Sequence, residues 1–317
     1  MPQDQQIIHT VPIEMDGQRL DQVVASLCPQ YSRSQIQKWI KAGHILVDHK
    51  ILKPKERLTG GEHLAINIVL EPQTEFDAED IPLNIVYEDD AILIINKPAG
   101  LVVHPAAGNW SGTLVNALLH YCPELELLPR AGIVHRLDKD TTGLMVVAKT
   151  LEAHNKLVEQ LQARDVSREY LALVHGKVVA GSTIEANIGR HPVDRKRQAV
   201  TEGGKEAITH YRVEARFPHH TLLRVSLETG RTHQIRVHLS YKHLPIVGDQ
   251  VYGGRPRFPA GASEALRNTV QQFPRQALHA TRLGLHHPMT GEALAWEVPM
   301  PADMSSLLET LRQATAV

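Results

Sequence analysis

The chain has 317 residues, of which 42% are hydrophobic, and this is enough for a large domain with a smaller one attached. A formal charge of −1 excludes a globally basic nucleic-acid binder, and two distant cysteines without CxxC spacing argue against a disulfide framework or a thiolate metal site. No apolar run approaches the roughly 18 residues of a membrane span, and the N-terminus lacks the features of a secretory signal, so we expect a cytoplasmic protein without membrane association.

Residues 14–72 have the pattern of a small α+β domain. The helical spacing of apolar residues predicts one helix over 17–27, and a serine cap within 32–34 introduces a second helix over 35–41. A hairpin is expected over 45–51, where apolar residues flank a polar turn.

This first domain has a local excess of basic residues. From residue 16 to residue 61, eight lysines and arginines face four acids. A solvated helix face is the ordinary explanation for such a run of charge. The basic residues recur on both the second helix and the hairpin, however, so we predict an RNA-binding patch that includes Arg33, Lys38 and Lys53.

Residues 73–82 are predicted to be an acidic linker. Eight acids and no lysine or arginine occur between residues 71 and 90, and Pro72 and Pro82 stiffen the stretch. Phosphate would repel such a tether, which would keep it free between two domains that both contact RNA.

Residues 83–317 are predicted to form the large domain. Frequent short strands and few helices predict an α+β fold with a large mixed, mainly antiparallel sheet and flanking helices. The expected hairpin lies within 85–95, the expected helices cover 113–121 and 151–164, and the expected strands cover 168–176, 207–217, 220–228 and 294–298.

The stretch 135–144, HRLDKDTTGL, concentrates charge between two apolar runs. We predict a strand at Ile133-Val134, a tight polar loop, and a second strand that includes 145–148. A loop needs polar residues and a turn, but it does not need an arginine two residues before an aspartate. Asp138 is therefore the candidate reactive group.

Two further stretches carry chemically capable side chains. Tyr170 begins a strand in the sequence REY, and 227–238 reads LETGRTHQIRVH. If 231–238 is a regular strand, Arg231 and His233 point to one face, while Arg236 and His238 point to the other. The two histidines are then poorly placed to share a metal ion and are better explained as structural. Neither a GxSxG nucleophile turn nor a glycine-rich phosphate loop is present.

Basic residues return in two loops of the large domain. The segment 190–197 holds four cations, among them Arg195 and Arg197, and we predict that it binds phosphate. The same prediction applies to the arginines of a Pro/Gly-rich insertion over 253–276, which are Arg255, Arg257, Arg267 and Arg275.

Taken together, HRLD with TGL at 142–144, then REY, then GRTHQIRVH resemble the motifs of the RluA family of pseudouridine synthases, and INKPAG at 95–100 resembles the family's first motif. The N-terminal domain resembles the alpha-L RNA-binding motif found in a ribosomal protein of the small subunit. It departs from that motif at Asp48-His49, where Asn-Gly is usual, which changes the turn more than the charge.

The resemblance implies an isomerisation in which uracil leaves C1′ of a uridine, rotates and rejoins through C5. It implies that Asp138 is the catalytic anion, which attacks C1′ or the base, or removes a ribose proton. Arg236 would pair with it, and Arg231 would be a second candidate. Tyr170 would stack on the target base and serve as general base, and Arg136 would hold the flipped-out RNA. The resemblance implies no cofactor and no metal.

The implied partner is large-subunit (23S) ribosomal RNA or a pre-ribosomal particle, and the expected oligomeric state is a monomer. Two other classes of function remain open. A catalytically silent RNA-binding or assembly protein would need only the N-terminal domain. An RNA methyltransferase would need a glycine-rich loop after a strand, which the sequence does not show.

Overall fold

The computed structural model describes residues 5–69, 76–106, 108–195, 197–254, 258 and 263–314. The chain divides into two compact units, residues 1–73 and residues 74–317. Residues 73–75 of the predicted acidic linker lie outside the described residues. Residues 76–82 are described and are bonded to the second unit, where Asn116 donates to the Asp77 carbonyl and the Gly112 N–H donates to Glu79.

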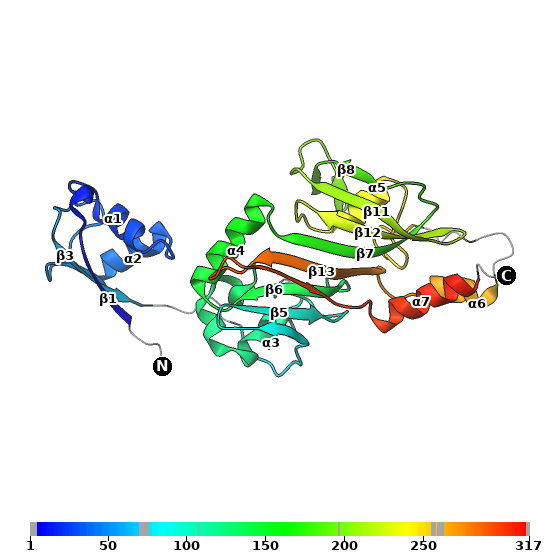
Figure 1. Cartoon of the computed structure of the whole chain (residues 1–317), viewed down its shortest axis with the longest axis horizontal. Coiled ribbons are helices and arrows are strands. Elements are labelled where there is room, and N and C mark those ends of the chain that lie inside the picture. Colours follow the sequence, from blue (N-terminus) through cyan, green and yellow to red (C-terminus); the bar gives the residue numbers. More distant parts are fainter. Residues whose placement is uncertain are drawn as a thin grey trace. The chain divides into compact units, whose positions relative to one another are not determined.

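The first unit is a three-stranded antiparallel sheet with two helices (Figure 1). Its strands are β1 (Gln5–Thr10), β2 (Ile45–Val47) and β3 (His63–Ile68), in the order β1-β3-β2. Its helices are α1 (Leu20–Leu27) and α2 (Arg33–Ala42), and a 3-10 turn covers Ile13–Met15. Helix α2 begins two residues before the predicted start because the Ser32 hydroxyl accepts a hydrogen bond from the Gln35 N–H.

The second unit contains a nine-stranded mixed sheet. Along the main path its strands are β4 (Ile85–Glu88), β5 (Ile92–Lys97), β6 (Thr142–Ala148), β13 (Leu278–His286), β7 (Ser167–His175), β12 (His220–Leu227), β11 (Ile208–Arg216) and β8 (Ser182–Glu185), and β14 (Ala293–Glu297) pairs with β13. All of these pairs are antiparallel except β6 with β13. The α+β prediction with a mainly antiparallel sheet is confirmed.

Helices flank this sheet, and a small separate sheet stands beside it (Figure 1). The helices are α3 (Leu114–Tyr121), α4 (Leu151–Ala163), α5 (Gln234–Tyr241), α6 (Glu264–Gln271) and α7 (Ala302–Gln313), with 3-10 turns over Pro123–Leu127 and Pro129–Gly132. The separate sheet pairs β9 (Ile188–Arg190) with β10 (Gln198–Val200).

Strand β6 is buried along its whole length because both faces of the sheet are covered there. Met145 and Val147 pack in the same hydrophobic cluster as Leu118 of α3. Val146 packs in a second cluster with Leu157 of α4. This two-sided burial explains why β6 is a continuous apolar run rather than an alternating one.

The predicted strand at Ile133-Val134 is wrong. Ile133 makes only a single bridge to Val147, and no regular strand precedes the loop. The chain enters from a 3-10 turn in which Arg130, Ala131 and Gly132 all have left-handed backbone angles. Residues 134–141, which follow this turn, form an irregular segment that leads into β6.

The parallel contact between β6 and β13 depends on Gly143. Its φ is +115°, and a Cβ built there would overlap the backbone of Ala280 on β13. We expect Gly143→Ala to lower the free energy of unfolding by roughly 2–5 kcal/mol, from a left-handed backbone cost of about 1–2 and an overpacking cost of about 1–3. Urea unfolding of the purified variant measures this loss.

Gly291→Ala is the matched control, because Gly291 also has a positive φ of +75° but has open space around its Cβ position. It should show only the backbone part of the cost. Equal losses in the two variants would mean that the close approach of β13 is not what constrains residue 143.

Candidate active site

A cavity of about 860 Å³ lies beside the irregular segment that precedes β6. Asp138, Tyr170 and Arg236 all line it, although they come from three distant parts of the sequence. Arg136 and Arg231 line it as well. The structure therefore brings together the three sequence stretches that were singled out for their chemistry.

The segment that carries Asp138 is fastened to the fold on both sides. Before it, Leu137 is buried in the main hydrophobic cluster. After it, the Thr141 N–H donates to the Asp138 carbonyl in a tight turn, and the Thr141 hydroxyl accepts from Gln276. The Arg275 guanidinium donates to the carbonyl of Asp140. These contacts hold the reactive carboxylate on a rigid support.

Lys97 is an anchor that sequence reasoning missed. It ends β5 and is only 1% exposed. Its Nζ donates to the carbonyls of Pro98 at 2.8 Å, Leu101 at 3.0 Å and Lys139 at 2.8 Å, which joins the INKPAG turn to the Asp138 segment. Burial lowers the pKa of Lys97 to about 7, opposed by the charges of Asp140 and Asp138. Three donated hydrogen bonds match the three protons of an ammonium group and favour the charged form.

Arg236 holds Asp138 from one side and is itself held from the other. Its Nη1 donates to Asp138 Oδ2 at 2.9 Å. Its Nε and Nη2 donate to the two oxygens of Asp249 at 2.7 and 3.0 Å. Burial lowers the pKa of Arg236, but Asp249 and Asp138 outweigh burial and raise it above its usual range.

Asp249 is a second residue that sequence reasoning missed. Its carboxylate is fully buried and also accepts the N–H groups of Val251 and Tyr252. Burial alone would raise the pKa of Asp249, but the bonds and charge of Arg236 and the two backbone N–H groups lower it below the ordinary value. A buried carboxylate with four donors is a rigid base for the arginine.

The prediction that 231–238 is a strand is wrong. Gln234–Tyr241 is helix α5, and His233 is its N-cap residue with a left-handed backbone. Residues 234–239 are all buried, so their apolar pattern does not mark one helix face. The Gln234 side chain accepts the Arg231 N–H and closes the turn that starts the helix.

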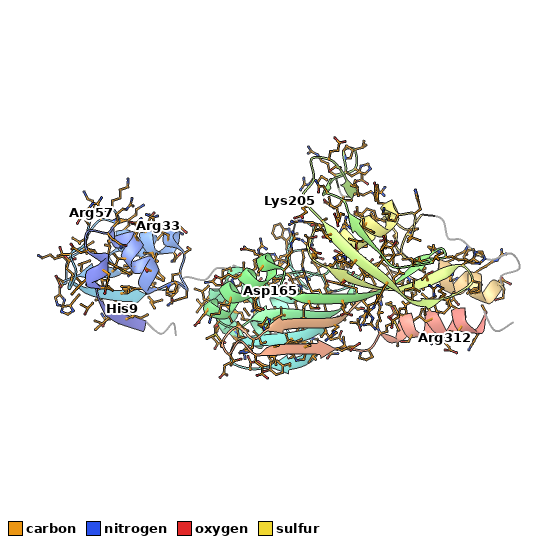
Figure 2. All side chains as sticks on the ribbon, turned by 45° about the horizontal axis from the view of Figure 1, so that its top comes forward. His9, Arg33, Arg57, Asp165, Lys205 and Arg312 are labelled. Carbon is orange, nitrogen blue, oxygen red and sulfur yellow. The ribbon has the colours of Figure 1, made fainter. Side chains whose placement is uncertain are left out.

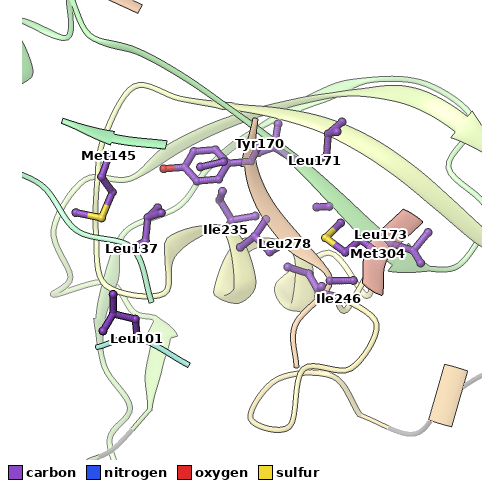
Figure 3. Packing of buried hydrophobic residues seen from close by; sticks show 14 of the residues in the cluster. Leu101, Leu137, Met145, Tyr170, Leu171, Leu173, Ile235, Ile246, Leu278 and Met304 are labelled. Atoms are coloured by element: carbon purple, nitrogen blue, oxygen red, sulfur yellow. The ribbon is translucent and has the colours of Figure 1, made fainter. Parts of the chain in front are cut away.

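Tyr170 forms part of the cavity wall and of the core. Its ring is 6% exposed and belongs to the same cluster as Leu137, Ile235 and Leu278 (Figure 3). Leu137 and Ile235 are the sequence neighbours of Asp138 and Arg236, so packing of one cluster fixes all three functional side chains. Burial raises the pKa of Tyr170, the charge of Arg168 opposes this, and Asp138 adds to it. The phenol is therefore the resting form at neutral pH.

Several arginines surround the cavity in addition to Arg236. Arg231 donates from Nε to the Glu206 carbonyl at 2.8 Å. Arg164 pairs with Glu206 and Glu228, each at 2.7 Å. Arg136 lines the same cavity. A cavity with this many guanidinium groups is suited to an anionic ligand.

The two histidines of the 231–238 stretch have different surroundings. His238 is buried and bonds Thr209 Oγ1 at 2.8 Å and the Ala186 carbonyl at 2.9 Å, which confirms its structural role. His233 lines the cavity, with its Nε2 4.0 Å from Asp138 Oδ1. Within the described ranges no group of three or more His, Cys, Asp or Glu side chains is placed to hold a metal ion.

The basic loops of the second unit are not alike. Arg195 is exposed, whereas Arg197 is half-buried, with its guanidinium 5.3 Å from the centre of the Tyr252 ring. The phosphate-binding prediction for Arg275 is wrong, because Arg275 is 5% exposed and bonds both oxygens of Asp303. Arg255 and Arg257 lie outside the described residues.

The basic patch of the first unit is exposed. Lys38 and Lys53 are exposed, and Arg33 donates to the fully buried carboxylate of Asp21 while its side chain remains 47% exposed. Arg33 and Arg57 lie away from His9 in Figure 2. Asp48 and His49 both have positive φ, so the turn keeps a left-handed form without the usual Asn-Gly.

None of the helices that the structure describes is both long and apolar enough to cross a membrane.

Each of the two units matches a known protein family. Residues 91–241 match the family model described as RNA pseudouridylate synthase, and residues 18–64 match the S4 domain model. The chain is 59% identical to ribosomal large subunit pseudouridine synthase D of Pseudomonas aeruginosa, over 96% of this chain and 95% of that protein. It is 56% identical to the protein of the same name from Escherichia coli K12, over 98% of this chain and 96% of that protein.

Solved structures show a similar fold. Human RNA pseudouridylate synthase domain containing 4 aligns with a TM-score of 0.57 and 26% identity, over 72% of this chain and 93% of that one. Human RNA pseudouridylate synthase domain containing 1 aligns with a TM-score of 0.54 and 24% identity, over 74% of this chain and 96% of that one.

We expect Asp249→Asn to lower the free energy of unfolding by roughly 3–5 kcal/mol near neutral pH, because Arg236 then keeps its charge in a buried site with one carboxylate fewer. The native pKa of Asp249 is lowered, so its contribution is complete above the ordinary carboxyl value and is lost as the pH falls through the native value. The gap between wild type and variant should therefore narrow below about pH 4. Urea unfolding at a series of pH values measures it.

Asp303→Asn is the matched control, since Asp303 holds Arg275 with the same two-oxygen geometry but is 40% exposed. Its loss should be smaller, because solvent already screens the exposed carboxylate and the Arg275 guanidinium also donates to the carbonyls of Asp140 and Gln276. A variant of Asp249 as stable as wild type would show that the buried pair does not support the fold.

Proposed function

This chain belongs to the RluA family of RNA pseudouridine synthases and carries an S4 RNA-binding domain, and from that premise we propose that it isomerises specific uridines of large-subunit (23S) ribosomal RNA. It is an isomerase that acts on RNA. The observation that carries the proposal is the meeting of Asp138, Arg236 and Tyr170 in one cavity. The names of the relatives support the choice of ribosomal RNA as the substrate.

The reaction is balanced without a second substrate. The bond between N1 of uracil and C1′ breaks, a bond between C5 and C1′ forms, C5 loses a proton and N1 gains one. No electrons enter or leave, so we propose that the enzyme uses no cofactor and no metal.

We propose Asp138 as the reactive anion. Arg236 occupies Oδ2 with a charge-assisted hydrogen bond, which fixes the plane of the carboxylate and leaves Oδ1 for the substrate. The side chain is 15% exposed, so it is open to the cavity and yet largely shielded from water. An oxygen held in this way can attack C1′ or the base, or remove a ribose proton, and the proposal covers all of these routes.

We propose that Tyr170 stacks on the flipped uracil and that the cavity arginines hold the surrounding phosphates. Flipping costs a few kcal/mol, and a base stack returns about 1–3 kcal/mol. Arg136 and Arg231 line the same wall as Asp138 and are the proposed RNA contacts there. Because the resting Tyr170 is a neutral phenol, its service as a base at C5 requires its own proton to pass to another group.

We propose that the S4 domain supplies affinity through Arg33, Lys38 and Lys53, and that Arg195 and Arg197 extend the RNA-binding surface on the second unit. The acidic linker would be repelled by phosphate and would leave both surfaces free to bind. The proposed partner is ribosomal RNA, free or in a pre-ribosomal particle. A cytoplasmic monomer is the form that we propose acts on it.

Purified protein should release tritium from a large-subunit rRNA transcript labelled at C5 of uracil, without added cofactor. Asp138→Asn keeps the shape of the side chain but removes the anionic oxygen, so release should fall by roughly 10³-fold or more. Filter capture of the RNA and scintillation counting of the released water measure the rate.

Asp90→Asn, a change at an exposed aspartate in the hairpin turn between β4 and β5, is the control and should leave release unchanged. Persistent release by Asp138→Asn would remove Asp138 from the reactive role. A requirement for an added methyl donor would place the protein in another class of enzyme.

If the basic patch of the S4 domain binds RNA, its lysines should contribute to the salt dependence of RNA affinity. Lys38→Gln and Lys53→Gln should each weaken RNA binding and reduce the slope of log affinity against log salt by up to about 0.7–0.9 per lost phosphate contact. Fluorescence anisotropy with the same transcript at several salt concentrations measures the slope. Arg312→Gln on α7, which removes an exposed charge paired with Glu309, is the control. A slope unchanged in both lysine variants would exclude these residues from the RNA surface.

A further inference from the structure

Tyr252 connects the active-site arginine to a basic hairpin of the second unit. This basic arm consists of β9, β10 and the described residues of the loop between them, 191–195 and 197. Arg190 and Arg195 are exposed on it. Tyr252 is only 7% exposed, and its backbone N–H donates to Asp249, the carboxylate that holds Arg236.

The Tyr252 hydroxyl joins the arm to the start of helix α5. It accepts a hydrogen bond from the N–H of Gln198, the first residue of β10, at 2.8 Å. It lies 2.9 Å from Nδ1 of His233, the N-cap residue of α5. With its one proton given to Nδ1, a neutral His233 carries its own proton on Nε2, which faces Asp138 Oδ1 at 4.0 Å.

The ring of Tyr252 completes the connection. The guanidinium carbons of Arg197 on the arm and of Arg236 lie 5.3 and 5.0 Å from its centre. The ring also packs in a small hydrophobic cluster with Ile188 of β9 and Val237 of α5. The Ser240 hydroxyl of α5 donates to the Tyr252 carbonyl at 3.2 Å. A displacement at the base of the arm would therefore also displace α5, the helix that carries Arg236.

We propose that Tyr252 is a positioning residue that couples RNA binding on the basic arm to the orientation of the Asp138–Arg236 pair. RNA held by the exposed arginines fixes the base of the arm on Tyr252, and Tyr252 in turn fixes His233 and Arg236 against Asp138. This inference rests on the proposed function, because it assumes that RNA is the ligand of the arm.

The test compares variants of the full chain at saturating concentrations of a large-subunit rRNA stem-loop transcript. Tyr252→Phe keeps the ring and removes the hydroxyl, and the rate of isomerisation should fall roughly 3- to 30-fold while RNA affinity stays within about twofold. Arg195→Ala should lower both affinity and rate, although Arg195 does not line the cavity. Arg312→Ala, at an exposed position of α7 that does not line the cavity, is the matched control and should change neither affinity nor rate.

The decisive measurement is the double variant. In the Tyr252→Phe background, Arg195→Ala should still weaken binding but should add no further loss of rate. Losses of rate that simply multiply would overturn the coupling and leave Tyr252 a local support of α5.

A second readout does not need turnover. The NMR signal of the Arg236 Nε–H should exchange more slowly with water when the transcript binds wild type, and this response should vanish in Tyr252→Phe and in Arg195→Ala. An identical response in all three proteins would overturn the coupling, whatever the activity. If wild type shows the response but releases no tritium, the proposed function fails and the coupling stands.

Discussion

The candidate site is organised by one buried positive charge. Two carboxylates, Asp138 and Asp249, accept hydrogen bonds from Arg236 and offset the cost of burying its charge. Asp249 is fully buried and bound by backbone N–H groups, so it takes no part in exchange with solvent. Asp138 faces the cavity. Arg236 is fixed by its ion pair with Asp249, and it therefore fixes the orientation of Asp138, the carboxylate that faces the substrate cavity.

The topology of the sheet places the Asp138 carboxylate within reach of Arg236. The one parallel contact, between β6 and β13, brings the Asp138 segment beside residues 275–279, which bond it through Arg275 and Gln276. Lys97 fastens the same segment to the end of β5. Three carbonyls accept hydrogen bonds from the Lys97 ammonium group and offset the cost of burying it. These bonds restrict the movement of the segment that carries Asp138.

Local sequence predicted those elements whose pattern is decided locally. The apolar run of β6, the serine cap of α2 and the hairpin of β4 and β5 all leave a visible signal in the chain. Helix α5 leaves none, because a helix buried on all sides has no apolar period. The sequence did not predict strand β13, because polar residues interrupt its apolar pattern. His279 and Thr281 are buried there and both bond the carbonyl of Val298, which directly follows β14. Asp249 could not be found, since nothing local marks it as the partner of Arg236.

The same distinction separates the two kinds of arginine in this protein. Motif and charge runs identified many cations, but only the structure tells which of them are already paired. Arg275 and Arg236 spend their hydrogen bonds on buried or half-buried carboxylates and therefore support the fold. Arg195 and the cavity-lining Arg136 are exposed, so phosphate can reach them. A chain with a net charge of −1 can thus bind RNA, because acids such as Asp249, Glu169 and Asp303 are paired with arginines, while basic residues such as Arg195 and Lys38 remain exposed.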